Sequence, residues 1–182
     1  RQKVESRFFE LLRIHRENLA EIRIGGKEGK YAIQMMVREV RICIEMAEKI
    51  NSKTKPQLQE EEILNFGYLA FFFGCVVTTN EKTAKTFRQN VKEFDSTFVD
   101  KYIKLCTSER QKIILGEKIN YDLFLGHQIR LSTYFRHLYH AIKYINLQPS
   151  DILSYRNKYE YITILRAQLS PHEQVLLFHH SL

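Results

Sequence analysis

The sequence predicts an all-α protein, a single helical bundle of about seven to eight helices that spans residues 1–182 as one domain. In every long segment, apolar residues recur at steps of three and four. Only 7 glycines and 3 prolines occur in 182 residues, which argues against the many turns of a β-sandwich or barrel. No stretch of useful length alternates apolar and polar residues as a half-buried strand would.

The first two helices are predicted to form a helical hairpin. The first has a seam that ends before Gly25 and Gly26, residues suited to a left-handed cap. Its seam consists of Phe8, Leu12, His15, Leu19 and Ile22. The second runs from about Lys30 to Ile50, and its seam consists of Ile33, Val37, Val40, Ile44 and Ala47.

The middle of the chain is predicted to contain three helices after a polar loop, residues 51–59, which includes Pro56. A third helix covers residues 60–73, and its three leading glutamates suit the positive end of a helix dipole. Asn80 is expected to cap a fourth helix, and Ser108 a short fifth helix up to Leu115, followed by a connection over residues 116–122. The inward residues of the fourth helix are Phe87, Val91, Phe94, Phe98 and Tyr102.

Three helices are predicted in the last third. The sixth covers about residues 124–147 and ends before Pro149, and the seventh covers residues 151–169. Ser170 and Glu173 form a capping box with Pro171 at the first position of an eighth helix. The stripe of the sixth helix is Leu131, Phe135, Leu138, Ile142 and Ile145, and that of the seventh is Ile152, Tyr155, Tyr159, Ile162 and Leu169.

Charge and cysteine content narrow the functional classes. The net charge of +7 suits nucleic acid or an acidic membrane surface and does not choose between them. Cys43, Cys75 and Cys106 lack CxxC spacing, so we expect free thiols in a reducing compartment, without an intramolecular disulfide. No signal peptide opens the chain.

The most apolar stretch, residues 63–77, is short and interrupted by Asn65, Gly67 and Gly74. We therefore interpret it as a buried helix, not a membrane span. The chain begins at Arg1 without Met and ends in an apolar run. This suggests a fragment trimmed from a longer protein, whose membrane anchor would lie elsewhere.

Three breaks in the amphipathic pattern point to functional residues. His15 lies in the seam of the first helix, and Arg166 lies between two apolar seam residues of the seventh. The third break is a row on one face of the sixth helix: His127, Arg130, Tyr134 and His137. Two interpretations stay open. In the first, these residues border a core and keep their polar ends in water, and His15 is a hydrogen-bonded core histidine. In the second, they line a cleft. We expect Arg166 to be buried, as a structural or catalytic keystone.

The catalytic interpretation is phosphodiester chemistry. Arg130 and His137 lie two helical turns apart and point the same way. An arginine can hold a phosphate in a fork, and a histidine can move the proton of a ribose 2′-hydroxyl or of the leaving oxygen. His137 and His140 have helical metal-ligand spacing but no neighbouring carboxylate or cysteine, so neither a metal nor another cofactor is expected.

Three motifs resemble those of phage abortive infection proteins, the AbiC-like family. The longest comprises residues 126–131, 134–139 and 143–145. A second comprises residues 8–12 and 15–18 of the first helix, and a third comprises Lys158, Tyr159, residues 164–170 and Glu173. The resemblance implies a bacterial anti-phage effector that shuts down the infected cell. Members of the family often carry membrane segments ahead of this domain.

Several abortive infection proteins also resemble HEPN ribonucleases, which have an arginine followed after four to six residues by a histidine. Arg130 and His137 satisfy that spacing, although Leu131 stands where the HEPN motif usually has a polar residue. The resemblance thus implies a metal-independent ribonuclease with Arg130 and His137 as catalytic residues. The supporting or binding candidates are His15, His127, Tyr134, Arg136 and Arg166.

The partners expected on this basis are RNA, a phage-derived trigger protein and a second copy of the chain in a homodimer. A membrane would be contacted only through a segment absent from this chain. The expected location is the cytoplasm, or the cytoplasmic face of the inner membrane if an anchor has been removed. The alternative function is a non-enzymatic sensing or protein-interaction module of a membrane-anchored defence protein.

Overall fold

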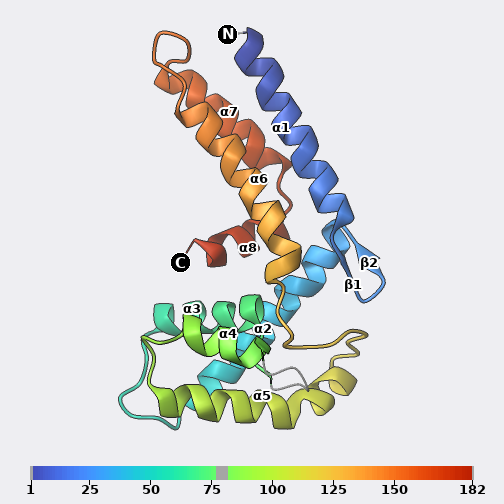
Figure 1. The fold of residues 1–182 in the computed structure, drawn as a ribbon, viewed down its shortest axis with the longest axis vertical. Helices are drawn as coiled ribbons and strands as arrows, with labels where there is room; N and C mark the ends of the chain where they lie inside the picture. Colours follow the sequence, from blue (N-terminus) through green and yellow to red (C-terminus); the bar gives the residue numbers. More distant parts are fainter. Residues whose placement is uncertain (1, 77–81, 182) are drawn as a thin grey trace.

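The structure, a computed structural model, describes residues 2–76 and 82–181. Within these ranges it contains eight α-helices and one short two-stranded ribbon, which confirms the all-α prediction (Figure 1). The elements are α1 (Gln2–Glu21), β1 (Arg23–Ile24), β2 (Lys27–Glu28), α2 (Lys30–Asn51), α3 (Glu60–Phe73), α4 (Lys82–Asn90), α5 (Ser96–Gly116), α6 (Gln128–Asn146), α7 (Tyr155–Gln168) and α8 (Pro171–His180).

The helices form two packed groups with separate hydrophobic clusters. Helices α2–α5 surround the larger cluster, and α1, α6 and α7 surround a smaller one at the opposite end of the elongated molecule (Figure 1). Helix α8 lies between the two groups, and Leu177 packs against both clusters. Helix α1 runs antiparallel to α6, so the start of the chain lies beside the second half of α6 (Figure 1).

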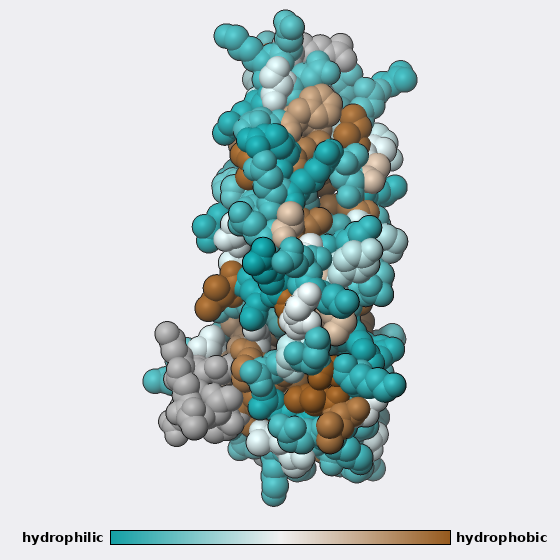
Figure 2. Space-filling model, turned by 90° about the vertical axis from the view of Figure 1, so that its right-hand side faces the viewer, coloured by the Kyte–Doolittle hydropathy of each residue, from teal (hydrophilic) through white to brown (hydrophobic). Residues whose placement is uncertain are grey.

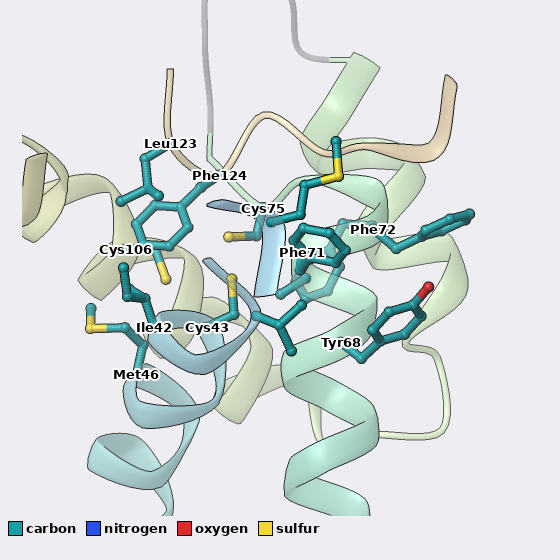
Figure 3. Close-up of a cluster of buried hydrophobic side chains, with 14 of the residues drawn as sticks. Ile42, Cys43, Met46, Tyr68, Phe71, Phe72, Cys75, Cys106, Leu123 and Phe124 are labelled. Carbon is teal, nitrogen blue, oxygen red and sulfur yellow. The ribbon is translucent and has the colours of Figure 1, made fainter. Parts of the chain in front are cut away.

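The larger cluster is built around aromatic rings and sulfur atoms. The Phe66 ring makes edge contacts with four other rings, at centroid distances of 4.9–5.5 Å. Figure 3 shows Cys43, Cys75 and Cys106 turned toward the same part of this core. All three are buried free thiols, as expected, and burial raises the pKa of Cys43 and Cys75 well above its usual range.

The predicted boundaries between residues 80 and 116 are wrong in two places. The expected cap Asn80 lies outside the described residues. The predicted fourth helix divides at residues 91–95, because the Asp95 side chain accepts a hydrogen bond from the Phe98 backbone N–H at 2.9 Å and starts α5 there. Ser108 caps no separate helix, since α5 continues through it to Gly116.

Two boundaries in the last third also differ from the prediction. Helix α6 begins at Gln128, not near Phe124, whose φ of 66° is incompatible with a helix. Helix α7 begins at Tyr155, because the Ser154 side chain caps it by accepting the N–H of Asn157. The capping box of Ser170 and Glu173 at the start of α8 is confirmed.

The predicted inward seam of α7 is wrong at its first half. Tyr155 is 84% exposed and Tyr159 is 63% exposed. Helix α7 instead buries Tyr161 and Leu165, which lie on the neighbouring face, while Leu169 is buried as predicted. The predicted stripe therefore lies on the surface at Tyr155 and Tyr159, whereas Ile162 packs against the smaller cluster.

A tight ribbon connects α1 to α2. Gly25 and Gly26 both have positive φ, and they form the turn between β1 and β2, where Ile24 pairs with Lys27. The two glycines do follow the first helix, but they turn a two-residue hairpin instead of capping it. Ile22 and Ile24 are buried against the larger cluster and fix the entry into α2.

Replacement of Gly126 by alanine should destabilise the protein by roughly 3 kcal/mol. Gly126 has φ +86°, and an added Cβ would lie 2.5 Å from the Phe73 carbonyl carbon. Urea unfolding followed by circular dichroism measures the change. Gly116→Ala is the matched control, because no atom lies within 4 Å of its added Cβ and its φ is not positive. Equal stability of both variants would contradict the close packing of the α6 entry on α3.

Candidate functional site

A buried polar cluster joins α1, α6 and α8. Its members are His15, Tyr134 and Glu173, all at most 3% exposed. The Tyr134 hydroxyl donates a hydrogen bond to Glu173 Oε1 at 2.8 Å. The His15 ring packs on the Tyr134 ring with centroids 4.8 Å apart, and His15 Nε2 lies 3.8 Å from Glu173 Oε1. Three elements far apart in sequence therefore meet at one carboxylate, and the two buried ring nitrogens of His15 have no hydrogen-bond partner among the described residues.

Glu173 also starts helix α8. Its Oε2 accepts a hydrogen bond from the Ser170 backbone N–H at 2.8 Å, and its own backbone N–H donates one to the Ser170 hydroxyl oxygen. Burial by itself raises the pKa of this carboxyl. The nearby His15 imidazole, Ser170 and Tyr134 outweigh burial and hold the pKa of Glu173 below its usual value. The cluster therefore favours the ionised carboxylate.

His127 belongs to a second buried pair, away from this cluster. Its Nε2 lies 2.9 Å from Glu39 Oε2 of α2, and its ring stacks on Phe71 with centroids 4.7 Å apart. Glu39, fully buried, also accepts the Phe124 backbone N–H at 2.9 Å. The pair ties the segment before α6 to the larger core. His127 is thus a core histidine and does not share a face with the rest of its predicted row.

Two clefts lie along one side of the antiparallel pair α1 and α6. The first, about 460 Å³, is lined at the α1 end by Asn18, Glu21 and Arg23 and on α6 by Arg130, Thr133 and Tyr134. The second, about 410 Å³, is lined by the earlier part of α1 and the later part of α6. Six of the residues that α6 and its C-cap contribute to the two clefts follow each other at steps of three and four: Arg130, Thr133, His137, His140, Tyr144 and Leu147. We call this side of the helix pair the α1–α6 groove.

The structure separates the seven predicted site residues into three groups. Arg130, exposed, and His137, half-buried, both face the α1–α6 groove but line different clefts. Tyr134 and His15 meet in the buried cluster beneath the groove. The remaining three, His127, Arg136 and Arg166, lie elsewhere.

Arg166 is the clearest correction. Its side chain is exposed, so the predicted burial is wrong. Helix α7 buries Leu165 instead of Arg166, and its C-cap residue Leu169 is buried as well. Arg136 is exposed on α6 and lines a different cleft, together with Phe135 and Tyr139.

The arginines are neutralised unevenly over the molecule. Among the residues described, the arginines of α2, α4 and α5 all form ion pairs with carboxylates. Five described arginines form none, and all of them are on α1, α6 or α7: Arg7, Arg16, Arg130, Arg136 and Arg166. Figure 2 shows that the side of the molecule carrying α1 is mostly hydrophilic, with hydrophobic atoms in separate patches. The arginines without an ion pair are therefore concentrated around the smaller core.

The two buried carboxylates were missed as site residues by the sequence analysis. Glu173 was recognised as a helix cap and as part of a family motif but not as a site residue, because its partners His15 and Tyr134 are more than thirty positions away. Glu39 lies next to Val40 in the buried stripe of α2, and that break in the pattern was the available signal.

Neither a metal cluster nor a membrane span is found in the described part of the chain. No group of three or more histidine, cysteine, aspartate or glutamate residues there could hold a metal ion. No described helix is both long enough and apolar enough to cross a membrane.

Comparison with known proteins identifies one family. The family model described as "Putative phage abortive infection protein" matches residues 126–182, which include α6, α7 and α8. The predicted family resemblance is thereby confirmed over this segment, and the match supports a role in phage abortive infection. No curated protein and no solved structure gives a significant match.

Tyr134→Phe should lower the free energy of unfolding by about 2 kcal/mol, because it leaves the buried Glu173 carboxylate without its hydroxyl donor. Chemical denaturation gives the value. Tyr139→Phe is the matched control, since this tyrosine of the same helix is 57% exposed. A Tyr134→Phe protein as stable as the Tyr139→Phe protein would rule out a stabilising hydrogen bond.

The stability of the protein should fall with acid through Glu173. Because the pKa of Glu173 is lowered in the folded state, its contribution is complete above the unfolded value of about 4.5 and is lost as the pH falls through the lower, folded value. Unfolding free energies measured between about pH 6 and pH 3 should therefore decline less steeply for Glu173→Gln than for the wild type. The exposed Glu48→Gln control should keep the wild-type slope.

Proposed function

We propose that this protein acts in phage defence by abortive infection and that its α1–α6 groove binds and cleaves RNA without a metal ion. The family match supports the defence role. The observation that carries the RNA proposal is the placement of Arg130 and His137 on the same groove, in a part of the molecule rich in unpaired arginines. A polyanion would neutralise these charges.

Three residues of the groove, Arg130, His137 and His140, would have distinct roles in the reaction. The Arg130 guanidinium forms no ion pair in the described structure and can hold a phosphate in a fork. His137 can accept the proton of a ribose 2′-hydroxyl, whose oxygen then attacks the adjacent phosphorus. The bond from phosphorus to the 5′ oxygen breaks, leaving a 2′,3′-cyclic phosphate. His140, in the same cleft, is the donor of the proton that the leaving 5′ oxygen needs.

The distance along α6 fits a strand lying in the groove. Arg130 and His137 are separated by about 10 Å along the helix axis, at roughly 1.5 Å per residue. The arginine is exposed and its long side chain can reach toward the histidine. The core side of α6 is formed by other residues, so changes at these two positions leave the packing intact.

Arg130→Ala and His137→Ala should each abolish phage protection in cells, with plaque counts returning to those of cells without the protein. Total RNA from infected cells should stay intact in these variants and be degraded with the wild type. Arg136→Ala is the matched control, because this exposed arginine of the same helix lines a different cleft. We expect it to protect and to degrade RNA like the wild type.

Two results would contradict the proposal. Protection by the wild type with intact RNA would reject RNA cleavage and leave the defence role. Equal loss of protection in all three variants would show that the charge of α6 matters and the groove does not. Thermal melts of each variant establish that it is folded.

A specific observation favours a second, non-enzymatic function. A mainly apolar cleft of about 390 Å³ lies between α3, α6 and α8, lined by Phe72, Phe135, Leu138, Tyr139, Ile142 and Leu177. Such a surface suits a protein partner, and the expected phage-derived trigger protein would bind there. In this alternative, protection persists in Arg130→Ala and His137→Ala and RNA stays intact throughout.

A further inference from the structure

We infer that the second cleft of the α1–α6 groove binds unpaired nucleotides, so that single-stranded RNA is the ligand. This inference rests on the proposed function, because it names the substrate of the same groove. The cleft lies between the first half of α1 and the second half of α6, and it shares His137 with the proposed reaction.

The rim of this cleft is cationic. Arg7 of α1 and Lys143 of α6 carry its positive charge, and His137 and His140 of α6 line the same cleft. No carboxylate is among the residues that line it, whereas the first cleft contains Glu21. Arg7 forms no ion pair among the described residues, since the nearby Glu10 carboxylate pairs with Arg13, and Lys143 lies over the ring of Tyr139 at 5.6 Å. The rim therefore lacks an anion, which phosphates of a nucleic acid strand would supply.

The floor of the cleft is apolar. Leu11 and Ile14 of α1 line it together with Tyr144 of α6 and Leu147, the residue that follows α6. Leu147 is 67% exposed, so its apolar surface is left in contact with water. A free phosphate or a sugar would gain nothing from this floor. A nucleobase would gain binding energy there, because its face can stack on an aromatic ring and cover aliphatic side chains.

A charged rim over an apolar floor favours single-stranded RNA over a duplex. In double-stranded RNA the faces of the bases are hidden in the stack, and only edges, sugars and phosphates are exposed. A single strand can place phosphates on the cationic rim and turn its bases onto Tyr144 and Leu147, as other single-strand binding surfaces do.

The test is fluorescence anisotropy with a labelled, unstructured 12-nucleotide RNA, the same RNA in a duplex, and the DNA strand of the same sequence. We expect the single-stranded RNA to bind at least about tenfold more tightly than the duplex. Single-stranded DNA should bind nearly as well, since the floor recognises bases and the 2′-hydroxyl matters only in cleavage.

Two matched pairs of variants locate the site. Leu147→Ser should weaken binding of the single-stranded RNA about fivefold with an unchanged salt dependence, while Leu115→Ser, at a 77% exposed leucine of α5, should have no effect. Lys143→Ala should reduce the slope of log affinity against log salt by about 0.7, while the exposed Lys104→Ala of α5 should leave it unchanged.

The outcomes separate this inference from the proposed function. Equal affinity for duplex and single strand, or equal effects of Leu147→Ser and Leu115→Ser, would overturn the inference even if the protein cleaves RNA. Tight single-strand binding that depends on Leu147, without any cleavage, would support it and reject the ribonuclease. Absence of binding to all three nucleic acids would overturn both.

Discussion

The arrangement of α1, α6 and α8 depends on the ionised carboxylate of Glu173. Glu173 is 2% exposed, and its carboxylate accepts a hydrogen bond from the Tyr134 hydroxyl. It also lies beside His15 and caps its own helix. A buried carboxylate that loses one of these partners leaves charge uncompensated, which costs far more than an exposed pair contributes. Glu173 therefore joins α6 to α8 beside α1, and the smaller hydrophobic cluster completes the contact between α1 and α6 on whose outer side the groove lies.

Glu39 has the corresponding role immediately before α6 begins. Its two oxygens bind His127 and the Phe124 backbone N–H, which holds the segment before α6 against α2 and α3. Gly126 allows that segment to approach the Phe73 backbone. Helix α6 is thus anchored at its start by one buried carboxylate and along its length by another. These anchors use the faces of α6 that point inward.

Much of the fold could be predicted from the sequence, because helical periodicity and caps are local signals. The capping box of Ser170 and the break at Pro149 were sufficient for α8 and for the end of α6. The first half of the α7 seam was misassigned, since Tyr155 and Tyr159 have the right spacing and only tertiary packing decides which face is buried. For the site, Arg130 and His137 could be placed on one face, but the partners of His15 and His127 could not, because both carboxylates are distant in the chain.

Different residues of α6 stabilise the fold and line the groove, which is why the groove side of the helix is free for a proposed chemical role. Leu131, Leu138 and Ile145 supply the hydrophobic contact, and Tyr134 supplies the buried hydrogen bond. Arg130 and His140 contribute to neither and stay exposed, and His137 is only half-buried. Stability and charge in the groove are therefore set by different residues of the same helix. A substitution in the groove is therefore expected to change what the groove binds, whereas a substitution at Tyr134 is expected to change how stable the protein is.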